Sequence, residues 1–524
     1  MILLNNVSLP LNTDFTDLVS TASRELRVPV SNIKSAELHR KSVDARKKNN
    51  VHFCCSILVE VLENEAKIIS KIKNANKYEY KPYVFKKALK SFKNRPVIAG
   101  FGPAGMFAAL TLARAGLRPL VLERGAEVDK RKQAVEDFFN GQKLDLKTNV
   151  QFGEGGAGTF SDGKLNTGIK NPRSRVVLEV FASHGAPQKI LTDAKPHIGT
   201  DILVNVVKSI REEIISLGGE IRFETKLESI KQENGKLVSI TANGGEIACE
   251  CLIIATGHSA RDTFKMLYDK GLSMAQKPFA MGVRIEHLQS DINKALYGEF
   301  WDNKNLGAAD YKLAVHLENG RGVYTFCMCP GGEVINASSE ENAIAVNGMS
   351  ESRRDGKNAN SALLVNVNPE DFGSDDVLAG IEMQSRIEQK AFSIAKGAVP
   401  VTTVGEFVFG EKFEITKVNP TVKPSFAYAD FNEIFPSFIT ESLKEGIKLF
   451  DRKIKGFADS SSVITAPETR SSSPVKVIRD EGMESISIKG IYPCGEGAGY
   501  AGGIVSAAVD GILVAEEIIN SEKY

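Results

Sequence analysis

Glycines at positions 100, 102 and 105 have the spacing of a loop that holds phosphate groups against the protein backbone. In a Gly-x-Gly-x-x-Gly segment the first glycine permits a tight turn and the second lets a diphosphate approach the chain. The third lets a helix and a strand pack closely. Free N–H groups and the positive end of a helix dipole, next to Pro103 and Ala104, would bind the phosphates. This spacing predicts a dinucleotide-binding site.

The elements around these glycines strengthen the prediction. Val97–Ala99 is an apolar strand, an alanine-rich helix runs to Ala115, and a second strand, Leu117–Leu122, ends at Glu123. A strand–helix–strand unit closed by an acidic residue is the setting in which this spacing predicts a dinucleotide. Glu123 is placed to accept hydrogen bonds from a ribose diol, and we assign the adjacent Arg124 to the same site.

Two distant segments carry residues of matching type. Thr256 and Gly257 follow the apolar strand Leu252–Ala255, and a glycine-rich loop joins the strand Ile488–Tyr492 to the helix Ile504–Ile519. The candidate binding residues of that loop are Gly495, Glu496, Gly502, Gly503 and Ile504. Together with the first motif, these segments resemble the two-dinucleotide-fold flavoproteins. The resemblance implies FAD, with Glu496 on the ribitol and the helix start at Gly503 and Ile504 facing the flavin pyrimidine edge. There the helix dipole would stabilise negative charge on the reduced ring.

A narrower resemblance rests on four other segments and one N-terminal segment. They are Gly153–Leu165, which includes Gly158, then Cys329–Gly332, Asn347–Ser350, Glu468–Pro474 and Ser42–Lys48. In these segments the chain resembles a bacterial group of uncharacterised FAD-dependent dehydrogenases, often described as using NAD. Residues 276–475 contain no second strand–helix–strand unit with a Gly-x-Gly-x-x-Gly fingerprint for NAD(P)H. Either NAD(P)H docks transiently as electron donor, or the electrons come from elsewhere.

Hydride transfer through flavin N5 needs few catalytic side chains, because the cofactor carries the chemistry. Cys327 and Cys329 lie two apart on an expected strand, so both should face the same side, and Cys329 could reach the flavin. The alternative is that both are small buried hydrophobic residues. His258, next to Gly257, is a candidate for proton transfer, and Lys164 is a candidate near flavin N5 or the phosphates.

Arg470 is the fourth catalytic candidate, because a guanidinium near the flavin would suit an anionic substrate such as a carboxylate. The alternative is an ion pair with Glu468 or Asp480. We therefore expect a small-molecule substrate, with an anion favoured.

Composition excludes several other classes of protein. The chain has 524 residues, 42% of them hydrophobic and 25% charged, with a net charge of +1, which is typical of a globular protein. Its seven cysteines lack Cys-x-x-Cys spacing, so we expect neither a structural metal nor a disulfide framework. The sequence has no secretory signal or membrane-spanning segment, and we expect a cytoplasmic protein without membrane contact.

We expect an α/β fold in four segments. Residues 1–93 form a small N-terminal α+β domain, ferredoxin-like, and residues 94–275 form the first part of a Rossmann-like FAD-binding domain. Residues 276–475 form an inserted, β-rich mixed α+β substrate domain, and residues 476–524 return to the FAD-binding domain. The first 93 residues contain 17 Lys and Arg against 9 Asp and Glu. A solvated or docking face is favoured over a nucleic-acid surface, because aromatic stacking partners are sparse.

The predicted function is that of an FAD-dependent oxidoreductase acting on an unidentified small molecule. Two alternatives remain open at this stage. One is a flavin-dependent RNA-modifying enzyme that holds RNA on the basic N-terminal domain, and the other is a non-catalytic flavin-bound redox sensor or scaffold. The sequence leaves the oligomeric state open.

Overall fold

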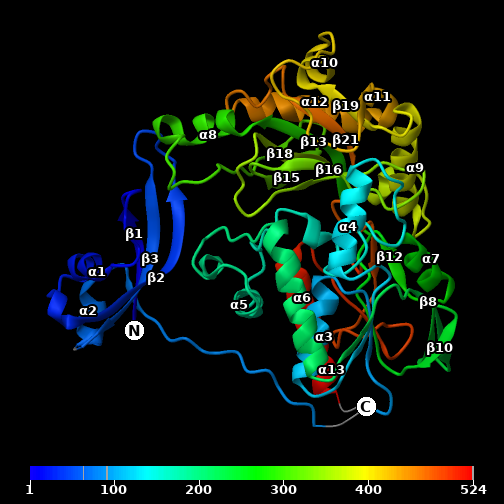
Figure 1. Ribbon diagram of the computed structural model, residues 1–524, viewed down its shortest axis with the longest axis horizontal. Helices are drawn as coiled ribbons and strands as arrows, with labels where there is room; N and C mark the ends of the chain where they lie inside the picture. The colour runs from blue at the N-terminus through cyan, green and yellow to red at the C-terminus, as the bar shows by residue number, and fades with distance from the viewer. Residues whose placement is uncertain (63, 90–91, 522–524) are drawn as a thin grey trace.

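The computed structural model of the chain describes residues 1–62, 64–89 and 92–521. Its N-terminal unit is a four-stranded antiparallel sheet in the order β2-β3-β1-β4, with two helices. The elements are β1 (Ile2–Leu9), α1 (Val19–Leu26), β2 (Ile33–Asp44), β3 (His52–Val61), α2 (Glu65–Lys71) and β4 (Ala75–Lys77). This βαββαβ order with its split strand pairs is the arrangement of a ferredoxin-like unit. Figure 1 shows it at the left, joined to the rest of the chain by an extended segment.

The N-terminal unit contacts the rest of the protein through strand β2 and through Phe300 and Leu306, which pack on its apolar core. Lys41 donates its backbone N–H to Thr192 O at 2.8 Å and accepts one from Ala194 N at 2.8 Å. The Lys41 ammonium lies 3.4 Å from Asp193 Oδ1. Two further basic side chains of the unit, Lys34 and Arg46, pair with Glu60 and Asp44. Part of the basic character is therefore used in docking and local ion pairs.

The next part of the chain is built on a five-stranded parallel sheet in the order β23-β11-β5-β6-β7. Its strands are β5 (Val97–Ala99), β6 (Leu120–Leu122), β7 (Glu220–Arg222), β11 (Leu252–Ile254) and β23 (Ile491–Pro493). Four of the strands are fully buried because both faces of the sheet are covered, as is usual for parallel sheets. Strand β6 is shorter than predicted: Arg118 has a φ of 46°, which is incompatible with an extended strand, so β6 begins at Leu120.

Alternate residues of these strands pack into two separate cores. Ile98, Val121 and Ile253 face the helical layer, whereas Val97 and Leu252 face the opposite side. The helical layer consists of α3 (Pro103–Arg114), α5 (Arg173–Ser183), α6 (Thr200–Ser216) and α13 (Ile504–Asn520), with α3 and α13 packed side by side (Figure 1). The opposite side carries the antiparallel strands β8 (Leu227–Glu233), β9 (Lys236–Ala242) and β10 (Gly245–Ala248), and helix α7 (Arg261–Asp269). Helix α4 (Val128–Phe139) follows β6 in the chain.

The chain leaves this part at β12 (Met274–Gln276) and returns at β22 (Val475–Val477), two strands that pair with each other. Between them lies a seven-stranded mixed sheet in the order β14-β15-β18-β13-β21-β19-β20. Its strands are β13 (Phe279–Leu288), β14 (Ala314–His316), β15 (Gly322–Cys329), β18 (Asn358–Val367), β19 (Val399–Thr403), β20 (Phe426–Tyr428) and β21 (Val463–Glu468). A separate hairpin pairs β16 (Glu333–Asn336) with β17 (Val346–Met349). The helices of this part are α8 (Gln289–Tyr297), α9 (Ala379–Ile394), α10 (Val404–Phe409), α11 (Phe431–Ile434) and α12 (Ser437–Asp451).

Within the described residues, no helix combines the length and the apolar character needed to cross a membrane. The large apolar core of the seven-stranded sheet is instead internal, with residues such as Val283, Leu363 and Ile439 fully buried.

Candidate functional site

A cavity of about 320 Å³ lies where the carboxyl ends of β5, β6, β11 and β23 meet the seven-stranded sheet. Ligands of open α/β sheets bind at this edge, because the loops that follow parallel strands converge there. Thirteen of the predicted cofactor-binding residues line the cavity. They are Gly100, Gly102, Pro103, Ala104, Glu123, Arg124, Gly158, Thr256, Gly257, Glu496, Gly502, Gly503 and Ile504.

The other two predicted cofactor-binding residues, Gly105 and Gly495, do not line it and support it from behind. A Cβ on Gly105 would lie 2.0 Å from Gly100 O, so this glycine is what lets α3 approach the turn after β5. Gly495 has a φ of 78°, and its N–H donates to Asp510 Oδ2 at 2.7 Å. Asp510, a buried residue of α13 that the sequence analysis did not identify, therefore orients the loop that carries Glu496.

Gly100 and Gly102 serve the loop in different ways. Gly100 has a φ of 98°, and a Cβ there would lie 2.4 Å from Ala255 O, so the turn itself requires glycine. Gly102 has a φ of −77°, which any residue adopts, and a Cβ there would meet nothing closer than Gly156 Cα at 3.6 Å. Because the fold does not require glycine at 102, the missing side chain instead leaves room in the cavity, as a bound diphosphate would need.

Glu123 ends β6, and its buried carboxylate holds three loops together. It accepts hydrogen bonds from the backbone N–H groups of Phe101 at 2.8 Å, Gly125 at 2.9 Å and Gly153 at 3.0 Å. A carboxylate has about four acceptor positions, so one is left for a ribose hydroxyl. The residue thus fits the predicted role while also supporting the site.

Arg131 of α4 is a fully buried residue that the sequence analysis missed. Its guanidinium donates to the carbonyls of Asn149 at 2.9 Å, Val150 at 2.9 Å, Glu154 at 2.6 Å and Gly156 at 2.9 Å. Burial lowers its pKa to about 10 despite the nearby carboxylates. These contacts fix the glycine-rich loop Gly153–Gly158, which forms one wall of the cavity. The helical spacing around residue 131 carries no signal of this role.

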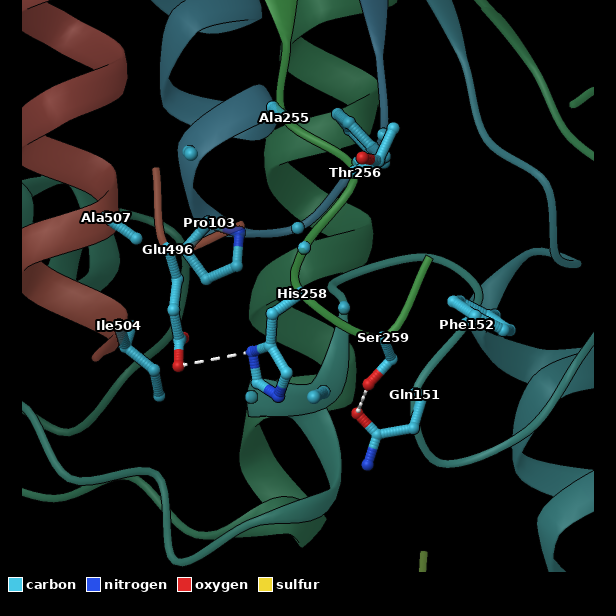
Figure 2. Close-up of a pocket in the computed structure, with 18 of the residues that line it drawn as sticks. Pro103, Gln151, Phe152, Ala255, Thr256, His258, Ser259, Glu496, Ile504 and Ala507 are labelled. Atoms are coloured by element: carbon cyan, nitrogen blue, oxygen red, sulfur yellow. Dashed lines mark hydrogen bonds and ion pairs between the residues drawn. The ribbon is translucent and has the colours of Figure 1, made fainter. Parts of the chain in front are cut away.

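His258 and Glu496 meet across the cavity (Figure 2). His258 Nδ1 lies 3.4 Å from Glu496 Oε1, and the side chain of His258 is 10% exposed. Its Nε2 is buried and has no hydrogen-bond partner in the described part of the chain. The neighbouring Ser259 donates to Gln151 Oε1 at 2.9 Å, which anchors the loop after β11. The Nε2 atom is therefore available to a ligand in the cavity.

Lys164 lines the cavity as predicted, and its Nζ lies 3.4 Å from Asp162 Oδ2. This Nζ makes no hydrogen bond to the described residues. Burial acts to lower the pKa of Lys164, but Asp162 and the thiols of Cys329 and Cys327 outweigh burial and raise it. Asp162 also receives hydrogen bonds from Arg354, one of them at 2.9 Å, and from Ser350. Lys164 is consequently a charged ammonium with donor capacity to spare.

Arg470 also lines the cavity, but its guanidinium is engaged elsewhere. Its Nε and Nη2 donate to the two oxygens of Glu388 at 3.0 and 2.7 Å, and its Nη1 donates to Ser339. Arg261 binds the same carboxylate at 2.8 and 2.9 Å. Glu388 is fully buried; burial alone would raise its pKa, but the two arginines lower it to about 2. Arg470 is therefore held in an ion pair, as the alternative prediction proposed. Its partner is Glu388, however, and not Glu468 or Asp480.

Arg284, on the buried strand β13, organises the wall opposite the sequence-predicted loops. It forms a bidentate pair with Glu468 at 2.6 and 3.0 Å and donates to Asn360 Oδ1 at 2.7 Å. A Cβ on Gly348 would lie 2.0 Å from Arg284 Nη1, so this glycine makes room for the guanidinium. The sequence signal for this role is an arginine within the mainly apolar run Phe279–Leu288, followed two residues later by a glutamate.

Cys329 does not line the cavity, whereas Cys327 does. The pairing of β15 with β18 shifts register between Phe326 and Cys329, and Cys327 has a φ of 42°. The expected regular strand is therefore wrong at this point, because a bulge interrupts the alternation, and of the two cysteines Cys327 rather than Cys329 reaches the cavity. Among the described residues, no group of His, Cys, Asp and Glu side chains is arranged to hold a metal ion.

Three family models match parts of the chain. A model described as "FAD-dependent protein, C-terminal domain-like" matches residues 278–471, and one described as "FAD dependent oxidoreductase" matches residues 204–346. A domain of unknown function matches residues 1–60. A relative from Clostridium beijerinckii, described as an uncharacterized protein, is 47% identical over 528 residues, covering 99% of this chain and 98% of its own length.

Similar solved structures include two proteins that act on amino acids according to their names. Glycine oxidase from Bacillus cereus is 14% identical, covers 82% of this chain and 96% of its own, and has a TM-score of 0.35. L-amino acid deaminase from Proteus vulgaris is 11% identical, covers 85% and 96%, and has a TM-score of 0.32. At these scores the similarity carries no argument about activity or substrate.

Proposed function

This chain belongs to the FAD-dependent oxidoreductase family, and we propose that FAD lies in the cavity between the five-stranded and seven-stranded sheets. The observation that carries this placement is the convergence of three distant segments on one cavity. The loop at 100–105, the turn at 256–257 and the loop at 495–504 all contribute to its lining. The neighbouring strands β5, β11 and β23 bring these segments together, and one extended dinucleotide would contact all three.

Two helices begin at the cavity, and their dipoles suit the charge of the cofactor. Helix α3 starts at Pro103 and helix α13 at Ile504, and both residues line the cavity. The N-terminus of α3 would bind the diphosphate and that of α13 would stabilise negative charge on the reduced flavin. Glu123 would accept from the adenosine ribose, and Glu496 would bind the ribitol.

The substrate in this proposal is a small anion that exchanges a hydride with flavin N5. The seven-stranded sheet contributes Phe326, Cys327 and Glu468 to the cavity, so it would contact the substrate. Arg470 and Arg284 are already paired with buried carboxylates, whereas the buried Nζ of Lys164, which lines the cavity, makes no hydrogen bond to the described residues. Lys164 would therefore position a carboxylate or similar group, and His258 Nε2 would exchange a proton. FAD itself supplies the redox chemistry.

The Gly102→Ala variant tests the placement of the cofactor. The added methyl group meets no protein atom within 3.6 Å, so the variant should unfold at the wild-type temperature when free of flavin. It should nevertheless bind FAD at least about tenfold more weakly, which corresponds to about 1.4 kcal/mol. Gly168→Ala is the matched control, since Gly168 is exposed and a Cβ there contacts nothing. Equal FAD affinity in both variants, measured by flavin fluorescence titration, would refute the placement.

The electron donor is tested separately. We propose that NAD(P)H docks transiently and reduces the flavin, without a dinucleotide-binding domain of its own. Anaerobic addition of NADH or NADPH to the FAD-loaded protein should bleach the visible flavin absorbance within seconds. Inertness toward both nucleotides, combined with normal bleaching by dithionite, would rule out a nicotinamide-dependent reductase and leave FAD binding untouched.

A further inference from the structure

Two cysteines lie at the bulged end of strand β15, beside the proposed flavin site. Cys327 is partly buried and lines the cavity, whereas Cys329 is fully buried behind it. Cys327 has left-handed backbone geometry, with a φ of 42°. That geometry is unfavourable for a residue with a side chain and is characteristic of strained functional sites. The bulge in β15 imposes this geometry at Cys327, whose side chain lines the cavity.

The surroundings of the two thiols differ in a way that favours one thiolate and one thiol. The Cys329 thiol donates to Cys327 O at 3.3 Å, and Arg284 Nη1 lies 3.8 Å from Cys329 Sγ. A side-chain hydrogen bond between the Cys329 and Cys327 thiols, helped by the positive charges of Lys164 and Arg284, lowers the pKa of the Cys327 thiol below its ordinary value despite burial. The same hydrogen bond, together with burial, raises the pKa of Cys329.

Lys164 completes this cluster from another element. The Nζ atom of Lys164 is buried and makes no hydrogen bond to the described residues. Its positive charge interacts electrostatically with both cysteines. A cation placed beside a thiol favours the thiolate, which is the reactive form in disulfide exchange. The cluster therefore has the composition of a reactive thiol site rather than that of an apolar core.

We propose that Cys327 and Cys329 form a dithiol–disulfide pair that exchanges two electrons with FAD. This inference rests on the proposed FAD site. Oxidation joins the Cys327 thiolate and the Cys329 thiol in one S–S bond and releases two electrons and the Cys329 proton. These go to oxidised FAD, which becomes the anionic reduced form, so that atoms and charge balance. The reverse step opens the disulfide at the expense of reduced FAD.

The short sequence separation of Cys327 and Cys329 permits a disulfide, but the Cys329 side chain must rotate to form it. Residues two apart have Cα atoms no more than about 7 Å from each other, close to the upper limit of about 6.8 Å seen in disulfides. Bond formation needs rotation of the Cys329 side chain out of its contact with Cys327 O. The pair would then be a labile disulfide, as expected for an electron carrier rather than a structural crosslink.

An anaerobic dithionite titration of the air-oxidised, FAD-loaded full chain tests the proposal. The wild type should consume four electrons per bound FAD, two for the flavin and two for the disulfide. Cys327→Ser and Cys329→Ser should each consume two. Cys54→Ser, in the N-terminal unit far from the cavity lining, is the matched control and should consume four.

Peptide mass spectrometry of the wild type gives a readout that is independent of activity and of the variants. The oxidised protein should yield a peptide spanning residues 327–329 that lacks two hydrogen atoms and resists N-ethylmaleimide, and dithionite should restore alkylation at Cys327. Uptake of two electrons by wild type, with both thiols free in the oxidised protein, would overturn the dithiol proposal and leave FAD binding intact. A protein that binds no FAD would instead overturn the proposed function.

Discussion

At the residue scale, the buried charged side chains around the cavity differ in whether other protein groups already pair with them. Glu388 sits between Arg470 and Arg261, both within 3.0 Å of its carboxylate oxygens, and all three side chains are buried or nearly so. Removing one member of such a cluster leaves uncompensated buried charge, which costs more than the net contribution of the intact cluster. The cluster therefore acts mainly to hold α9, α7 and the segment after β21 in place.

Glu388→Gln should destabilise the protein by ~3–5 kcal/mol, because it removes the buried carboxylate that both guanidinium groups share and leaves Glu340 as the anion beside Arg261. Chemical denaturation measures this loss. Glu382→Gln, an exposed position on the same helix, is the control and should change the free energy of unfolding by less than ~0.5 kcal/mol.

The pH dependence follows from the same ion pairs. The pKa of Glu388 is about 2 in the folded protein and ~4.3 when unfolded, so its contribution is complete above pH 4.5 and is lost as pH falls toward 2. Between pH 5 and pH 3 the wild type should therefore lose more stability than Glu388→Gln does, by ~1–2 kcal/mol. Parallel pH profiles for the two proteins would contradict the assigned ion pairs.

At the element scale, Arg131 makes most of the side-chain hydrogen bonds that hold the glycine-rich loop Gly153–Gly158 and the turn before it. Arg131 supplies hydrogen bonds to carbonyls of Asn149, Val150, Glu154 and Gly156, none of which belongs to a regular helix or strand. Gly153 approaches the same side chain so closely that a Cβ would lie 2.5 Å from Arg131 Cδ. The loop and the arginine thus form one packing unit.

Arg131→Met should preserve the volume of the side chain but leave these carbonyls without donors. Each unpaired buried carbonyl costs ~1–3 kcal/mol, so the protein should lose at least ~3 kcal/mol of stability and bind FAD more weakly. Thermal unfolding and flavin titration measure the two effects. Lys130→Met, at the exposed neighbouring position of α4, should change neither; a stable, fully FAD-competent Arg131→Met would show that the loop holds its shape unaided.

At the scale of the whole molecule, the N-terminal unit has its own apolar core, and none of its described residues lines the cavity. Its described contacts with the rest include the two backbone hydrogen bonds of Lys41 and the pair with Asp193. The following segment stays with the FAD-binding part, since Phe85 stacks on Arg114 at 4.6 Å.

A chain that begins at residue 78 should therefore retain FAD binding, with an affinity within about threefold of the full chain, or ~0.6 kcal/mol. Flavin titration of both chains checks this. Loss of flavin binding in a soluble, folded truncated chain would show that the N-terminal unit shapes the site through contacts beyond those of Lys41.

The local elements of the site follow from the sequence because their signals are local. The turn at Gly100, the helix that starts at Pro103 and the acidic end of β6 at Glu123 depend on neighbours a few residues away. Family resemblance added the distant Glu496 loop, and the structure brings it to the same cavity. The expected location of the cofactor thus rests on local residue types and spacing together with the family resemblance.

Tertiary structure alone decided which polar side chains remain available there. The sequence gives no reason to rank Lys164 above Arg470 as an unpaired cation in the cavity. In the structure, however, Glu388, which lies 82 residues away in the chain, binds the Arg470 guanidinium. Strand alternation predicts that Cys327 and Cys329 face the same side, with Cys329 reaching the flavin, but at the bulge in the pairing with β18 it is Cys327 that lines the cavity. Long-range ion pairs and strand register depend on which distant segments meet, and no periodicity within a segment encodes that.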